Sequence, residues 1–209
     1  VTWSWVSQRF VWPRMRAFVD AFLATCLGCA KARGGKVIPR RWLRTAKATE
    51  PNEIIHFDFF KVREPSEATP EGLTYVLVIV DGFSRFVELV PCKAANATTT
   101  TAALLDWFKR NGIVKRWVSD QGTHFLNAVV TEMANRLRVE HHFTTAHTPW
   151  ANGRVERMNR EVRELLTLFC LEAEIGPERW PDVLPLVQYT INNTPSTVLA
   201  GYAPIKVFC

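Results

Sequence analysis

The sequence predicts an α/β fold, a five-stranded mixed sheet flanked by helices. The first observation is the order of the periodic runs, because three strand-like runs come first and helical and strand-like runs then alternate. The second is Asp81-Gly82 between two apolar runs, a strong hairpin signal that makes those two strands antiparallel. The third is a helical stripe of apolar residues that begins at Val155.

Each expected element has a signal of its own. Alternation in residues 54–62 predicts a strand that places His56, Asp58 and Phe60 on one face. Further strands are expected at 73–80, 86–90, 116–119 and 139–143, and helices at 94–110, 125–137, 155–169 and 182–193. The stripes expected on the first three helices are Leu104, Leu105 and Phe108; Phe125, Val129, Met133 and Leu137; and Val155, Met158, Val162, Leu165, Leu166 and Phe169. This order of elements is that of the RNase H-like fold.

The charge is distributed unevenly along the 209 residues, whose net charge is +6. Residues 1–49 hold ten of the 26 Lys and Arg residues and one of the 20 acids, which leaves residues 50–209 at −3. A basic segment of this kind is expected to contact phosphate. The apolar runs are far shorter than the ~20 residues that span a bilayer, so we expect an intracellular protein without a membrane partner. Because the chain starts with Val1, we also expect it to be a piece of a longer polypeptide.

The first thirty residues suggest a small helical module. An apolar stripe from Met15 to Leu23 predicts a helix that runs into Cys26-Leu27-Gly28-Cys29. This Cys-x-x-Cys pair has the spacing of half a structural zinc site, although a redox pair or two buried cysteines remain alternatives. Five dispersed cysteines argue against a disulfide framework.

The next segment, residues 31–52, is expected to be a basic linker lying on a nucleic-acid backbone. A nuclear-import signal in residues 40–47 is the alternative. The residues expected to contact DNA here are Lys31, Arg33, Lys36, Arg40, Arg41 and Arg44.

Three acids form the candidate catalytic site. Asp58 lies within the first expected strand of the core, Asp120 ends a later strand, and Glu156 lies near the start of a helix, with 35 residues between Asp120 and Glu156. Carboxylates that converge without cations would repel one another, so convergence implies metal. A pair of divalent ions would activate an attacking oxygen and stabilise a leaving oxygen during phosphodiester chemistry. Any one of these acids, taken alone, is better explained as a strand-end or helix-cap residue. Asp81 is another candidate for an active-site acid, but we assign it to the hairpin turn at Asp81-Gly82.

The motifs Ser119-Asp120-Gln121-Gly122 and Asn152-Gly153-x-Val155-Glu156, at this spacing, resemble the catalytic core of retroviral and retrotransposon integrases, with gypsy-type LTR retrotransposons most similar. The resemblance implies an RNase H-like polynucleotidyl transferase or endonuclease that processes DNA 3′ ends and transfers strands. It also implies two Mg²⁺ or Mn²⁺ ions, with Asp58 bridging both while Asp120 and Glu156 each hold one. DNA and further copies of the chain are the implied partners, and the nucleus is the expected place of action.

Phe10-Val11-Trp12-Pro13 before Cys26 and Cys29 resembles the C-terminal half of the zinc module that precedes the integrase core. The two histidines of that module would fall upstream of Val1, so we expect only a partial zinc site, filled when those histidines are present. The expected domains are therefore residues 1–30 for the partial zinc module, 31–52 for the linker and 53–209 for the catalytic core.

The helix carrying Glu156 predicts a DNA contact. Asn159, Arg160 and Arg163 share a flank with Glu156, and the resemblance implies that basic residues here contact the DNA end. The alternative is a solvated flank in which Glu156 pairs with Arg160. At the level of the whole chain, the alternatives to an integrase are a domesticated or decayed element that binds nucleic acid without catalysis, and an RNase H-like nuclease.

Overall fold

The computed structural model describes residues 6, 10–25, 47–62, 69–122, 124–144 and 153–209. The chain divides into two compact units, Val1–Leu43 and Arg44–Cys209, which are described separately. Among the described residues, no helix combines the length and apolarity needed to cross a membrane.

The first unit contains helix α2, Met15–Thr25, which confirms the helix expected from the apolar stripe. Val19 is buried, while Arg16 and Asp20 form an exposed ion pair one turn apart. Cys26 and Cys29, the candidate zinc ligands, lie outside the described residues, as do the linker residues 31–44. The partial zinc site and the linker's DNA contacts therefore stay predictions.

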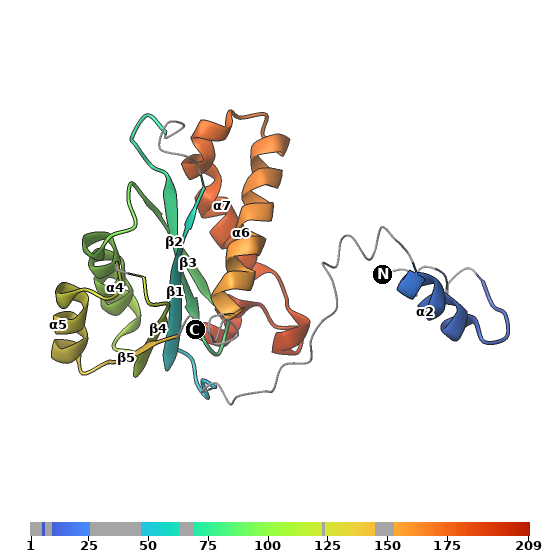
Figure 1. Ribbon diagram of the computed structural model, residues 1–209, viewed down its shortest axis with the longest axis horizontal. Coiled ribbons are helices and arrows are strands. Elements are labelled where there is room, and N and C mark those ends of the chain that lie inside the picture. The colour runs from blue at the N-terminus through green and yellow to red at the C-terminus, as the bar shows by residue number, and fades with distance from the viewer. Residues whose placement is uncertain (1–5, 7–9, 26–46, 63–68, 123, 145–152) are drawn as a thin grey trace. The chain divides into compact units, whose positions relative to one another are not determined.

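The second unit is built on the expected five-stranded mixed sheet (Figure 1). Its strands are β1 (Ile54–Lys61), β2 (Tyr75–Asp81), β3 (Val87–Cys92), β4 (Arg116–Ser119) and β5 (Glu140–Phe143), in the spatial order β3-β2-β1-β4-β5. The first three strands are antiparallel, whereas β4 runs parallel to β1 and β5 parallel to β4. This topology confirms the RNase H-like prediction.

Helices cover both faces of the sheet (Figure 1). The pair α4 (Ala97–Asn111) and α5 (Ala128–Leu137) packs on one face, and the pair α6 (Gly153–Glu172) and α7 (Trp180–Asn193) packs on the other. The remaining short elements are η3 (Pro177–Arg179), η4 (Thr197–Leu199) and α8 (Pro204–Phe208). Helix α4 begins where the Asn96 side chain accepts a hydrogen bond from Thr99 N and ends at Gly112, whose φ of 81° suits glycine.

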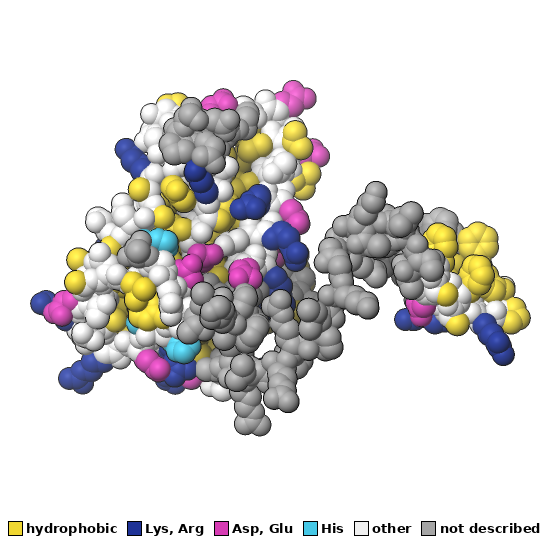
Figure 2. All heavy atoms as spheres, in the orientation of Figure 1, with side chains coloured by type: hydrophobic (Ala, Val, Ile, Leu, Met, Phe, Trp, Pro, Cys, Tyr) yellow, Lys and Arg dark blue, Asp and Glu magenta, His cyan; other side chains and the backbone are white. Residues whose placement is uncertain are grey.

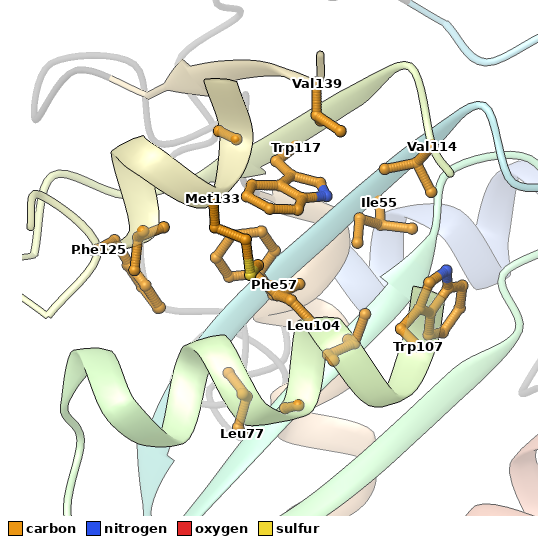
Figure 3. Close-up of a cluster of buried hydrophobic side chains, with 14 of the residues drawn as sticks. Ile55, Phe57, Leu77, Leu104, Trp107, Val114, Trp117, Phe125, Met133 and Val139 are labelled. Carbon is orange, nitrogen blue, oxygen red and sulfur yellow. The ribbon is translucent and has the colours of Figure 1, made fainter. Parts of the chain in front are cut away.

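Alternation along β1 divides its side chains between two cores. Ile55 and Phe57 enter the core under α4 and α5, where Phe57 lies beside Trp117 and near Met133 (Figure 3). Phe60 enters the core under α6 and α7, so the face of β1 that carries His56, Asp58 and Phe60 is the one toward α6. The predicted shared face is confirmed.

Two predicted helix stripes were confirmed only in part, since Leu104 and Met133 are buried but their predicted neighbours Leu105 and Val129 are exposed. In α4 the buried residues are Thr100, Ala103, Leu104 and Trp107, whereas Leu105 is 37% exposed. In α5 they are Val130, Met133 and Ala134, whereas Val129 is 56% exposed. Small residues can pack closely against the sheet, so the rotation of each helix follows the fit to the strands rather than the largest apolar side chains. Phe125 is buried as expected, but before α5 begins.

Candidate active site

Asp58 lies in the middle of β1, on the face toward α6, and is half-buried. Burial is the largest cause that raises the pKa of Asp58, to about 7, and the charges of Asp120 and then Glu156 raise it further. A hydrogen bond from Asn159 opposes these effects by stabilising the ionised carboxylate. The three predicted acids thus share one electrostatic site.

Asp120 follows directly after β4, as predicted. The parallel register pairs His56 with Val118, and continuing it by two residues places Asp58 beside Asp120 at the carboxyl end of β4. Gly122 N donates a 2.9 Å hydrogen bond to Asp120 Oδ1. A Cβ atom at Gly122 would lie 3.0 Å from the same oxygen, so the glycine permits this close approach.

Glu156 lies in the first turn of α6 and is exposed. Among the described residues, no three His, Cys, Asp or Glu side chains converge closely enough to coordinate a metal ion. The charges of the three acids therefore influence one another, but their side chains do not converge closely enough in this structure to coordinate a metal ion together.

The donor chemistry nevertheless fits a divalent cation. Hard cations such as Mg²⁺ and Mn²⁺ prefer carboxylate oxygens, and a cation would relieve the repulsion that raises the pKa of Asp58. Asn159 Oδ1 is a buried acceptor with no hydrogen-bond partner in the structure, so one polar atom beside Asp58 is unsatisfied.

Asn159 has a role that the sequence did not indicate. We expected it to contact DNA, whereas the structure gives its side-chain amide a 2.9 Å hydrogen bond to Asp58 Oδ2. Its position three residues after Glu156, on the same side of the helix, is the signal that could have suggested this contact.

The two predicted DNA-binding arginines of α6 are exposed. The Arg163 guanidinium lies over the ring of Phe60, 5.3 Å from its centroid, and Phe60 shares the strand face of Asp58. Glu156 and Arg160 form no ion pair in the part of the chain that the structure describes. The ion pair expected if this flank were only a solvated surface is therefore not formed. In Figure 2, Lys and Arg side chains lie along the position of α6, with acidic side chains beside them.

Asp81, the rival acid, is fully buried and belongs to the hairpin. Its Oδ2 accepts hydrogen bonds from Phe83 N, Ser84 N and Ser84 Oγ, and its Oδ1 accepts one from Asn52 N. Oδ2 is thus committed to the turn between β2 and β3 and Oδ1 to the backbone before β1, which supports the structural interpretation.

Two histidines near Asp120 were not predicted from the sequence to belong to the site. His141 Nε2 lies 2.9 Å from Ser119 Oγ, and that hydroxyl donates to the carbonyl oxygen of Asp120 at 3.1 Å. Burial lowers the pKa of His141 to about 4, with a smaller contribution from His142. Burial also lowers the pKa of His124, against the raising effect of Asp120.

Comparison with known proteins agrees with this architecture. Residues 48–149 match the integrase core domain family, and residues 1–34 match the integrase zinc binding domain family. The chain is 30% identical over 189 residues to the Pro-Pol polyprotein of Simian foamy virus type 3 (strain LK3), covering 90% of this chain and 16% of that protein. It is 34% identical over 199 residues to the Gag-Pol polyprotein of Feline leukemia virus, covering 95% and 11%. The chain thus spans less than a fifth of these curated relatives.

Solved structures share the fold. The HTLV-2 integrase catalytic core domain in complex with magnesium superposes with a TM-score of 0.64 at 20% identity, covering 78% of this chain and all of that one. A chain of the simian T-cell lymphotropic virus intasome in complex with PP2A regulatory subunit B56 gamma gives a TM-score of 0.68 at 21% identity, covering 92% of this chain and 66% of that one. The family matches, together with this fold, identify an integrase core domain in residues 48–149 and an integrase zinc binding domain in residues 1–34.

Proposed function

We propose that this chain is part of the integrase of an LTR retroelement of gypsy type, which processes DNA 3′ ends and transfers them to target DNA. The observation that carries the proposal is the placement of three acids on neighbouring elements: Asp58 in β1, Asp120 directly after the parallel strand β4, and Glu156 in the first turn of α6. The charges of Asp120 and Glu156 raise the pKa of Asp58, in agreement with this placement. The family matches and the viral relatives support it.

In this proposal Asp58, Asp120 and Glu156 would hold two Mg²⁺ or Mn²⁺ ions. When bound, the ions would supply activation of the attacking oxygen and neutralise charge on the leaving oxygen. Asn159 orients the Asp58 carboxylate, and Gly122 N orients that of Asp120. The pKa of Asp58 near 7 means that cation binding at neutral pH would release a proton from part of the population. Magnesium in the HTLV-2 core structure is consistent with this cofactor.

The DNA partner would be held by phosphate contacts on the exposed flank of α6, at Arg160 and Arg163, and along the basic linker. The protein would act as a homo-oligomer in the nucleus, with Cys26 and Cys29 contributing to a zinc site in the N-terminal domain. The intasome and the dimeric and trimeric core structures among the similar folds support the oligomer and DNA partner.

The test is strand transfer of labelled DNA ends by the longest expressible polypeptide that contains this chain, with Mg²⁺ or Mn²⁺. Asp58→Asn, Asp120→Asn and Glu156→Gln should each abolish product while leaving the melting temperature close to that of the parent. Glu164→Gln, an exposed acid of the same helix, is the matched control and should retain activity.

The alternatives give different outcomes. A folded parent that binds DNA but transfers no strands would favour a non-catalytic element. Cleavage of an RNA–DNA hybrid without strand transfer would favour a nuclease. Full activity of Asp58→Asn would remove the proposed site.

A further inference from the structure

A pocket of about 480 Å³, whose lining includes none of the three acids, lies where the turn between β2 and β3 meets the start of α6. Three cationic side chains line it: Lys47 from the segment before β1, Arg85 from the turn, and Arg157 from α6. Residues far apart in the sequence thus bring three positive charges to one hollow.

No free carboxylate neutralises these charges in the described lining. Asp81 is the only acid there, and its two oxygens already accept four hydrogen bonds from Asn52, Phe83 and Ser84. Among the described residues, Lys47, Arg85 and Arg157 form no ion pair. Three cations against the single buried carboxylate of Asp81 leave a net positive charge in the described lining, which favours an anion.

The position of Arg85 is fixed by the turn. Its φ is 63°, in the left-handed region, and its backbone N donates to Asp81 O at 3.1 Å. Phe86 N donates to Ser84 Oγ, so the residues on both sides of Arg85 are held by the same network. The backbone of Arg85 is therefore held in place by hydrogen bonds. Arg85 also lines a second, neighbouring pocket of about 280 Å³.

The lining also has an apolar wall, which includes Phe83, Met158 and Val198. Phe83 is 38% exposed and Val198 72% exposed. A cationic rim beside an apolar wall suits a phosphate carried on a sugar or base, because arginine matches phosphate oxygens in paired hydrogen bonds while the wall contacts the less polar part.

We propose that this pocket binds a backbone phosphate of nucleic acid at a subsite separate from Asp58, Asp120 and Glu156. Arg157 directly follows Glu156 in α6, lies about 100° further around the helix, and lines the pocket together with residues of the β2–β3 turn. The nucleic-acid ligand rests on the proposed function, whereas the preference for phosphate rests on the pocket itself.

The experiment compares Arg85→Gln/Arg157→Gln with Arg136→Gln/Arg138→Gln in the whole chain. Both variants lose two charges, and Arg138 has a left-handed φ of 56°, so the control matches Arg85 in backbone as well as charge. Duplex DNA affinity is measured by fluorescence anisotropy at several salt concentrations. The pocket variant should lower the slope of log affinity against log salt by about 0.9 for each lost phosphate contact, whereas the control should keep it. Melting temperatures check folding, and Arg85→Lys/Arg157→Lys should restore most of the slope.

An unchanged slope, or an equal fall in the control, would overturn the proposal. A titration with inorganic phosphate followed by NMR distinguishes the source: loss of phosphate binding in the pocket variant with an unchanged DNA slope would identify a soluble phosphate ligand and reject nucleic acid. Asp58→Asn should keep the DNA slope. If the parent transfers no strands but the pocket variant still lowers the slope of log DNA affinity against log salt, the phosphate subsite is supported and the proposed integrase function is rejected.

Discussion

The side-chain amide of Asn159 in α6 donates a 2.9 Å hydrogen bond to Asp58 in β1, joining residues 101 positions apart. This bond links the helix that carries Glu156 to the strand that carries Asp58, the acid whose pKa is raised to about 7. Among the described residues, Asn159 Oδ1 is left buried and without a hydrogen-bond partner, beside the proposed metal site. Asn159 is therefore expected to position Asp58 rather than only to contact DNA.

Asn159→Ala should weaken metal use. Without the amide donor the ionised form of Asp58 loses stabilisation, so its pKa should rise further and cation binding should require more Mg²⁺. Mutation of a residue that hydrogen-bonds a metal ligand typically lowers metal affinity or activity by about 10–100-fold. The measurement is the Mg²⁺ concentration for half-maximal strand transfer. Asn193→Ala removes an amide that bonds only its own helix, at Tyr189 O, and should leave that concentration unchanged. Equal values in parent and Asn159→Ala would contradict the positioning role.

Asp58→Asn should stabilise the metal-free protein at alkaline pH. The folded-state pKa of Asp58 is raised from 3.8 to about 7, so the unfolded chain releases this proton before the folded protein does. Stability is therefore lost as pH rises from about 4 through 7, and the amide removes that loss. Thermal melts with a chelator should show the variant gaining on the parent between pH 5 and pH 8. Added Mg²⁺ should stabilise the parent more than the variant, and a constant difference across this range would refute the coupling.

His141→Gln should reduce the acid sensitivity of folding. The folded-state pKa of His141 is lowered to about 4 from 6.5, so the unfolded chain binds the proton first as pH falls. The contribution of neutral His141 is present above about pH 6.5 and is lost progressively towards pH 4. Denaturant melts at pH 7 and pH 4.5 measure the difference. His142→Gln, on an exposed neighbour, is the control, and parallel pH profiles for the parent and His141→Gln would disprove the assignment.

Asp81→Asn should damage folding rather than chemistry. The buried carboxylate accepts four hydrogen bonds, and an amide would turn a donor group toward backbone N–H groups. A loss of about 3 kcal/mol in the free energy of unfolding is expected from such a site. Asp106→Asn, on the exposed surface of α4, should change it by less than about 0.5 kcal/mol. The Mg²⁺ dependence of any folded Asp81→Asn protein should match the parent, and a shifted dependence would return Asp81 to the list of active-site acids.

Local patterns predicted much of the fold. The Asp-Gly turn, the alternation in β1 and the stripe of α6 depend on residues close in sequence, and all three are confirmed. The stripes of α4 and α5 were misjudged because those helices bury Thr100 and Ala134 while leaving Leu105 and Val129 exposed. Apolar character alone did not identify the buried face.

The sequence by itself determined the order of the strands and helices, the hairpin at Asp81, and the placement of Asp58, Asp120 and Glu156 on separate elements. Only the tertiary structure decided that Asn159 bonds Asp58, that His141 contacts Ser119, and that Lys47, Arg85 and Arg157 line one pocket. The physical reason is that turns and periodicity depend on near neighbours, whereas contacts between distant side chains depend on strand register and on the rotation of each helix against the sheet.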